Sequence, residues 1–125
     1  MPHVIIEGPA SLERLYQNFT SESLRQGGCI IKLRSMYLNT TKTDALIDCV
    51  VVEDGLPQNF YALLSQKSSS ERNAAITVRL DPMTDPQKTD GVKRLVALLG
   101  QRLKAQDPAC TYGSTNLTEY LERDV

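Results

Sequence analysis

The sequence predicts an α+β fold in which two β-α-β units form a four-stranded mixed sheet, with two helices on one face and an inserted hairpin. Three observations support this class. Short stretches are rich in β-branched residues, apolar residues recur at helical spacing after two of them, and the second half repeats the strand, helix, strand order of the first. The length fits a single domain, residues 1–125, with the insert at about 39–72.

The first half begins with a strand and a helix. Residues 3–7 (HVIIE) are apolar on successive positions, the pattern of a strand covered on both faces, and Gly8-Pro9 ends it. Ser11 caps a helix that we expect to extend to about Gln26. Its apolar stripe consists of Leu12, Leu15, Tyr16 and Phe19.

A second strand is predicted over residues 29–38 (CIIKLRSMYL). Apolar residues on one face alternate with basic residues on the other: Ile31, Leu33 and Tyr37 against Lys32 and Arg34. Tyr37 is therefore expected in the core. Together the three elements make a right-handed β-α-β unit.

The middle of the chain predicts an inserted hairpin. Residues 39–42 have turn composition and residues 45–52 (ALIDCVVV) read as a strand. Residues 59–66 fit either a short strand or two helical turns, because an apolar run of this length does not decide between them. Residues 67–72 (KSSSER) indicate a polar loop.

The second half repeats the strand, helix, strand plan. Residues 74–80 alternate as a strand does, and a helix follows over 85–104, with Asp85 as its cap and proline in its first turn. A short fourth strand is predicted at 109–112. Residues 116–122 fit a final helical turn or an extended arm.

Charge and hydropathy exclude several classes of partner. The net charge is −1, from 14 basic and 15 acidic residues that are scattered along the chain, so we expect no nucleic-acid partner. Apolar runs are far shorter than the ~20 residues that cross a bilayer, so we expect no membrane partner. The sequence starts without a leader pattern, which predicts a cytoplasmic protein.

The cysteines indicate neither a disulfide framework nor a metal site. Cys29, Cys49 and Cys110 are widely spaced and odd in number, and His3 is the single histidine. We expect buried, inert thiols and no metal or cofactor.

One face of the predicted sheet lacks a cover. Two helices cover one face, but the strand at 3–7 carries apolar residues on both sides. In a chain this short the other face is expected to pack against a second copy, which predicts a homo-oligomer.

Within this plan, a few residues resemble a known family. The opening MPHVIIE, Arg34 within Leu33-Arg34-Ser35, and residues 73–95 leading into the second helix resemble the tautomerase superfamily, most closely its 5-carboxymethyl-2-hydroxymuconate isomerase branch. The resemblance implies that Pro2, as a processed N-terminal amine, is the catalytic acid/base. It also implies that Arg34 is substrate-binding and that three copies pack as a barrel-like homotrimer.

The chemistry suits these residue types. One amine of suitable pKa can remove a proton from a carbon acid and return it elsewhere, and a guanidinium offers two parallel donors to a carboxylate. If Met1 is retained, however, the Pro2 nitrogen is an amide and has no basicity.

Three functional hypotheses follow. The first is an isomerase, a keto-enol tautomerase that shuttles a proton on a small unsaturated keto or enol carboxylic acid, with Pro2 as acid/base and Arg34 as anion contact. The alternative is a catalytically inactive trimer of the same fold that acts as a binding or interaction protein, with the 39–72 insert as its working surface. The third is an unrelated ferredoxin-like monomer.

Overall fold

The computed structural model describes residues 1–67 and 74–122, which form seven strands and three helices. The strands are β1 (His3–Glu7), β2 (Glu22–Gln26), β3 (Cys29–Leu38), β4 (Asp44–Glu53), β5 (Leu56–Lys67), β6 (Ala75–Leu80) and β7 (Thr111–Thr115). The helices are α1 (Leu12–Gln17), α2 (Asp90–Lys104) and α3 (Thr118–Glu122).

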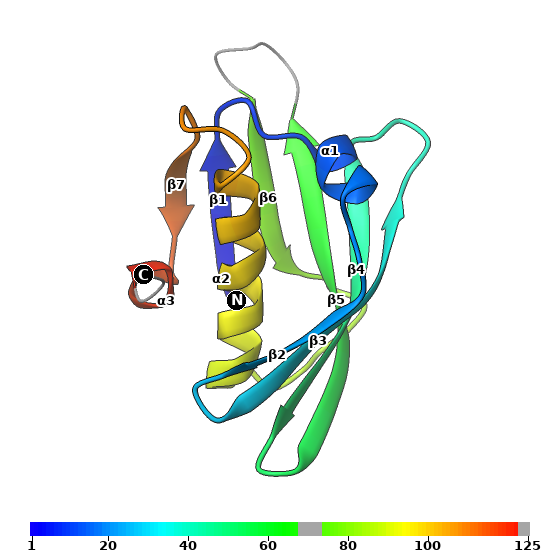
Figure 1. Cartoon of the computed structure of the whole chain (residues 1–125), viewed down its shortest axis with the longest axis vertical. Helices are drawn as coiled ribbons and strands as arrows, with labels where there is room; N and C mark the ends of the chain where they lie inside the picture. Colours follow the sequence, from blue (N-terminus) through cyan, green and yellow to red (C-terminus); the bar gives the residue numbers. More distant parts are fainter. Residues whose placement is uncertain (68–73, 123–125) are drawn as a thin grey trace.

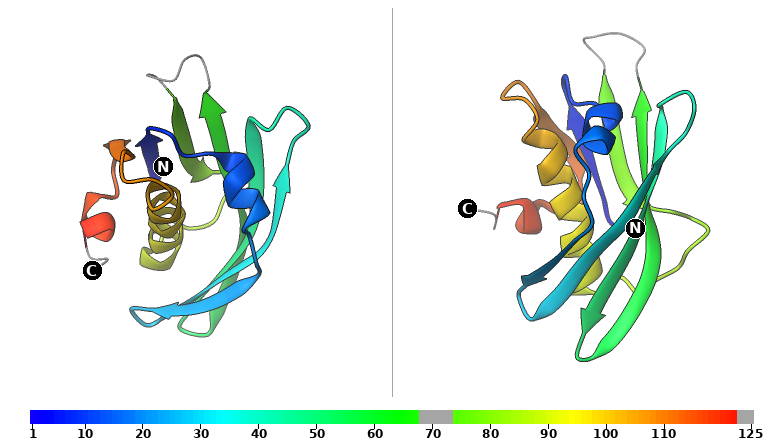
Figure 2. Two further views of the ribbon diagram at one scale, coloured as in Figure 1. Left: turned by 45° about the horizontal axis from the view of Figure 1, so that its top comes forward. Right: turned by 45° about the vertical axis from the view of Figure 1, so that its right-hand side comes forward.

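All seven strands belong to one antiparallel sheet with the order β2-β3-β4-β5-β6-β1-β7. The sheet curls into a half-barrel around α2, and α1 lies on the same inner face (Figures 1 and 2). After β1 the chain crosses this inner face through α1 to reach the far edge of the sheet, returns strand by strand from β2 to β6, and adds β7 beside β1. Within the described residues, the opposite, outer face of the sheet carries no helix (Figure 2).

The prediction of a four-stranded mixed sheet with two helices is wrong. The first predicted β-α-β unit places β1 next to the strand at 29–38, but β1 pairs antiparallel with β6 and β7, and three strands separate it from β3. The inserted hairpin is part of the same continuous sheet, since β4 pairs with both β3 and β5. Local patterns located many of the strands but not their partners, because partners are chosen by packing between distant segments.

The first helix is much shorter than expected because a strand follows it. It ends at Gln17, and the segment predicted to continue it forms β2, whose side chains alternate between half-buried and exposed. Gly27 and Gly28 both have positive φ, 54° and 87°, and join β2 to β3 in a tight turn. Two successive residues of positive φ are what a two-residue hairpin requires, so this glycine pair begins a hairpin rather than ending a helix.

The middle of the chain follows the hairpin prediction more closely. The turn at 39–42 connects β3 to β4 as expected, and the undecided segment 59–66 is a strand within β5. A second tight turn uses Asp54 and Gly55, both at positive φ. The polar loop predicted at 67–72 falls, after Lys67, outside the described residues.

Helix α2 begins at Asp90, four residues later than the predicted start after an Asp85 cap, because a strand of the sheet supports a different cap. Thr89 is the N-cap, and its side chain accepts a hydrogen bond from the Val92 N–H at 3.4 Å. The Glu53 carboxylate of β4 accepts hydrogen bonds from the Gly91 N–H at 3.1 Å and from the Thr89 hydroxyl. These acceptors satisfy donors that a helix leaves unpaired at its start, and the negative charge is favourable there. The end of α2 at Lys104 agrees with the prediction.

Two glycines allow α2 to lie very close to the sheet. A Cβ added at Gly91 would be 2.5 Å from the Val51 Cγ1 of β4, and one at Gly100 would be 2.6 Å from the Val4 Cγ1 of β1. Any larger side chain would therefore push the helix away from the core that it covers. The buried residues of α2 on this side include Val92, Leu95, Val96, Leu99 and Leu103.

We predict that Gly100→Ala lowers the free energy of unfolding by about 1–2 kcal/mol, measured by urea denaturation. The added methyl group collides with Val4, and overpacking a core costs about 1–3 kcal/mol, which exceeds the gain of up to ~1 kcal/mol from replacing glycine in a helix. The same substitution in a Val4→Ala background removes the collision and is expected to be neutral or stabilising. A Gly100→Ala protein as stable as the wild type would contradict the close contact.

Candidate functional site

Pro2 lies at the start of β1 and is buried. Met1 precedes it, and the Met1 carbonyl accepts a hydrogen bond from Asn116 Nδ2 at 2.9 Å and lies 3.1 Å from His3 Nδ1. In the alternation of β1, Pro2 comes before Val4 and Ile6, which are fully buried. With Met1 attached, the Pro2 nitrogen belongs to an amide and cannot act as a base.

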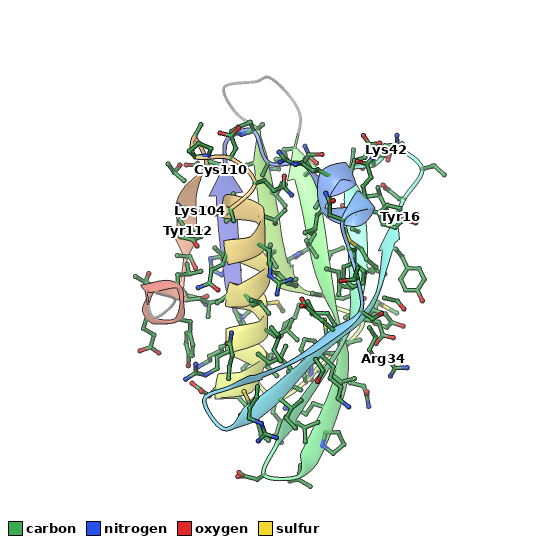
Figure 3. All side chains as sticks on the ribbon, viewed as in Figure 1. Tyr16, Arg34, Lys42, Lys104, Cys110 and Tyr112 are labelled. Carbon is green, nitrogen blue, oxygen red and sulfur yellow. The ribbon has the colours of Figure 1, made fainter. Side chains whose placement is uncertain are left out.

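Arg34 lies on the other side of the sheet. It is the extra residue of a bulge in β3, where the register with β4 shifts between Leu33 and Ser35. Its side chain is 58% exposed, points away from α2 (Figure 3), and has its Nε 3.7 Å from Asp48 Oδ2. Three strands separate β3 from β1, which corresponds to about 19 Å along the sheet at ~4.8 Å per spacing. Within one chain the structure does not bring Pro2 and Arg34 together.

The same bulge corrects the position of Tyr37. An extra residue at position 34 reverses the alternation, so Ile31, Leu33 and Met36 face the core while Tyr37 faces outward and is 58% exposed. Tyr37 therefore belongs to the outer face, and not to the core as predicted.

The outer face contains an apolar groove of about 470 Å³ around Tyr37. Tyr37, Leu46 and Leu63 are register partners on β3, β4 and β5 and form one row across the sheet. Met83, 89% exposed, lines the groove from the segment after β6, and Asp81 lies nearby in the same lining. The sequence did not predict this groove, because the alternation of apolar and polar residues does not reveal the bulge that turns Tyr37 outward.

The groove continues into a broader apolar surface. Outward positions of a solvent-facing antiparallel sheet are normally polar. Here several are apolar and at least partly buried by their neighbours: Ile5, Ile30, Leu46, Val50, Val52 and Leu63. We call these residues, together with Tyr37 and Met83, the outer apolar face. Around them lie charges of both signs, at Lys32, Arg34 and Arg79 and at Asp44, Asp48 and Asp81.

Asp44, at the edge of this face, is held in place by hydrogen bonds. Asp44 accepts hydrogen bonds from the Thr43 hydroxyl at 2.9 Å and from the Ser65 hydroxyl at 2.8 Å, and Asn39 Oδ1 accepts from the Asp44 N–H at 3.1 Å. These bonds fix the β3–β4 turn against β5. The rim of the groove is thus held in a defined shape.

A separate cluster of titratable groups joins α2 to α3. Asp90 accepts hydrogen bonds from Arg94 Nε and from the Tyr120 hydroxyl, both at 2.7 Å, and the Arg94 guanidinium lies 5.7 Å from the Tyr120 ring centroid. Gly27 leaves room for this guanidinium, since an added Cβ would be 2.8 Å from Arg94 Cζ. The cluster therefore fastens α3 and the β2–β3 turn to the first turn of α2.

The cysteines are buried thiols, as predicted, and all three are free. Burial raises the pKa of Cys49 to about 12 and also raises the pKa of Cys29. Both are therefore thiols at neutral pH and poor nucleophiles. Among residues 1–67 and 74–122, no three histidine, cysteine, aspartate or glutamate side chains are grouped so as to hold a metal ion.

No helix within the described part of the chain is long and apolar enough to cross a membrane. Comparisons with known protein families, with curated proteins and with solved structures find no match to this chain.

An isomerase assay on small 2-hydroxydienoates tests the roles predicted for Pro2 and Arg34. Because the Pro2 nitrogen is an amide when Met1 is present, we expect no rate above buffer for that form. If protein lacking Met1 is active, Pro2→Ala should abolish the rate, whereas Arg34→Gln should leave KM unchanged because Arg34 is about 19 Å away along the sheet. A tenfold rise in KM for Arg34→Gln would instead place this arginine in the site, supplied by another copy.

The Tyr120 cluster gives a pH-dependent prediction. Burial, followed by the hydrogen bond to Asp90, raises the pKa of Tyr120 to about 12, whereas a free tyrosine has a pKa of about 10. A folded-state pKa above the unfolded value means that the contribution to stability is complete below pH 10 and is lost between pH 10 and 12. We expect Tyr120→Phe to lower the free energy of unfolding by about 1 kcal/mol at pH 8, and the difference from wild type to shrink by pH 11.

Urea denaturation of both proteins at the two pH values measures this difference. Tyr16→Phe is the matched control, since Tyr16 is 47% exposed on α1, and it should show no difference at either pH. A Tyr120→Phe deficit that is equally large at pH 8 and pH 11 would contradict the assignment.

Proposed function

We propose that this chain is a binding protein that associates with a second copy of itself through the outer apolar face. The observation that carries the proposal is the row formed by Tyr37, Leu46 and Leu63. It is an apolar strip on the side of the sheet opposite α1 and α2, where none of the described helices lies. Large exposed apolar patches on a folded domain mark interaction sites. This function corresponds to the interaction-protein hypothesis, without the trimer and without the tautomerase fold.

The charges on this face favour a partner with the same surface. Along β4 the outward residues are Val50, Asp48, Leu46 and Asp44 in turn, and Lys32 is the register partner of Val50. Val50 and Asp44 lie at equal distances on either side of a point between Asp48 and Leu46. A twofold axis through that point would place Lys32, the neighbour of Val50, in one copy opposite Asp44 in the other. A twofold interface repeats each contact, so one such complementary pair occurs twice.

The size of the face is close to what a dimer needs. Four strands, β3 to β6, span about 19 Å at ~4.8 Å per strand, and the ten residues of β4 extend about 34 Å. Their product is about 650 Å², which is somewhat below the ~800 Å² per partner of a standard interface. Met83 and its neighbours extend the surface at its edge. Two sheets packed face to face in this way form a sandwich, a common way to bury apolar sheet faces.

Sedimentation equilibrium tests the proposal. The wild-type protein is expected to have a mass twice the 13.9 kDa of one chain at micromolar concentration. Leu46→Glu places a charge at the centre of the outer apolar face, so that dimerisation would bury two unpaired carboxylates, and we expect at least a hundredfold weaker dimerisation.

Tyr16→Glu is the matched control, because it adds the same charge at an exposed position on α1, across the sheet from this face. It should remain dimeric, and far-UV circular dichroism should be unchanged in both variants. A wild-type protein that sediments as a single chain at 100 μM would overturn the proposal.

A further inference from the structure

A pocket of about 270 Å³ opens on the inner side of the molecule, between α1 and the C-terminal end of α2. We call it the α1/α2 pocket. Its lining includes two arginines, one from each helix, and two apolar side chains from α1 and the turn after it: Arg14, Arg102, Leu15 and Phe19. None of these residues belongs to the outer apolar face, which lies across the sheet.

The two walls of the pocket are held together by glutamine side chains. Gln106, just after α2, accepts a hydrogen bond from the Ser11 N–H at 2.9 Å and donates one to the Ser11 carbonyl at 3.1 Å. Gln66 of β5 accepts another from the Leu12 N–H at 3.0 Å. The start of α1 is therefore tied to both α2 and the sheet. A ligand would enter a space whose walls are already in place, which limits the ordering cost of binding.

The floor of the pocket is apolar. Leu15 and Phe19 are half-buried, pack against the main core and also line the pocket. A flat ring or a branched alkyl group placed on them would remove their remaining apolar area from water.

The polar side of the pocket is cationic. The Arg14 guanidinium belongs to none of the ion pairs among the described residues, and Glu13, the one acid of α1, pairs with Lys42. Arg102 donates to Glu22 through one nitrogen, which leaves further N–H donors of its guanidinium available. Arg102 also lies in the last turn of α2, where a positive charge offsets the partial negative charge of the helix end.

We propose that the α1/α2 pocket binds a small amphipathic anion, an aryl or branched-alkyl carboxylate. Its apolar part would lie on Leu15 and Phe19, and its carboxylate would pair with Arg14 and with the free donors of Arg102. Guanidinium groups bind carboxylates through two parallel hydrogen bonds, which gives both charge and orientation. The volume of about 270 Å³ is slightly below the range typical of small-molecule sites, so the ligand is a small acid with a single ring or a short branched chain.

Fluorine NMR provides a direct readout, because the chain has two phenylalanines. Incorporation of 4-fluorophenylalanine places one label in the pocket at Phe19 and one in the core at Phe60, which is 2% exposed. The probe is 3-phenylpropionate. We expect the Phe19 signal to shift saturably with a Kd of about 1 mM or below, while the Phe60 signal stays in place.

Three comparisons separate recognition of the anion from unspecific apolar binding. Arg14→Gln should weaken binding at least about tenfold, as should replacing the probe by the neutral 3-phenylpropanol. Arg25→Gln changes an arginine on β2 that is also exposed but does not line the pocket, and it should leave the Kd unchanged. An unchanged Phe60 signal in each variant reports an intact fold. The proposal is overturned if Phe19 does not respond at about 10 mM probe, or if the alcohol or the Arg14→Gln protein gives the same Kd as the acid and the wild type.

Discussion

The seating of α2 in the curled sheet is the contact on which the rest of the structure depends. The helix touches β4 at its start and β1 near its end, and in both places only a glycine fits, Gly91 against Val51 and Gly100 against Val4. Glu53 fixes the start of the helix from the sheet itself. Strands at different positions in the sheet are therefore held around one helix, and this requires the sheet to curl.

This one-sided packing explains why the outer face matters. Among residues 1–67 and 74–122, helices α1 and α2 cover the inside of the curl and no helix covers the outside. The expectation that the uncovered face meets another copy came from apolar residues on both sides of β1, including Ile5. That reasoning depends on the alternation along a strand and not on which strands pair. It therefore applies to the seven-stranded sheet, in which Leu46 and Leu63 face outward as well.

Local chemistry predicted local features of this fold, and tertiary contacts decided the rest. The strand cores of β1, β3, β4 and β6 and the end of α2 at Lys104 follow from alternation and helical spacing. The start of α2 does not follow from local spacing, because Thr89 becomes the N-cap through its hydrogen bond to Glu53 on a distant strand. The bulge at Arg34 reverses the alternation of β3, so the residues after it face the opposite side from the one predicted. The turn at Gly27-Gly28 forms a hairpin, so the residues before it form a strand and not the predicted end of a helix.

The candidate sites also depend on contacts between distant segments, which the sequence patterns do not reveal. The resemblance predicts that Pro2 and Arg34 share a site, but within one chain the pairing of β1 with β6 places three strands between β1 and β3. No sequence pattern links Arg14 with Arg102. They line one pocket because α1 crosses the inner face beside the end of α2. In this chain, sites are created where the crossing segment and the long helix meet, or where the sheet is left uncovered. Both are properties of the topology, so they emerge only once the order of the strands is known.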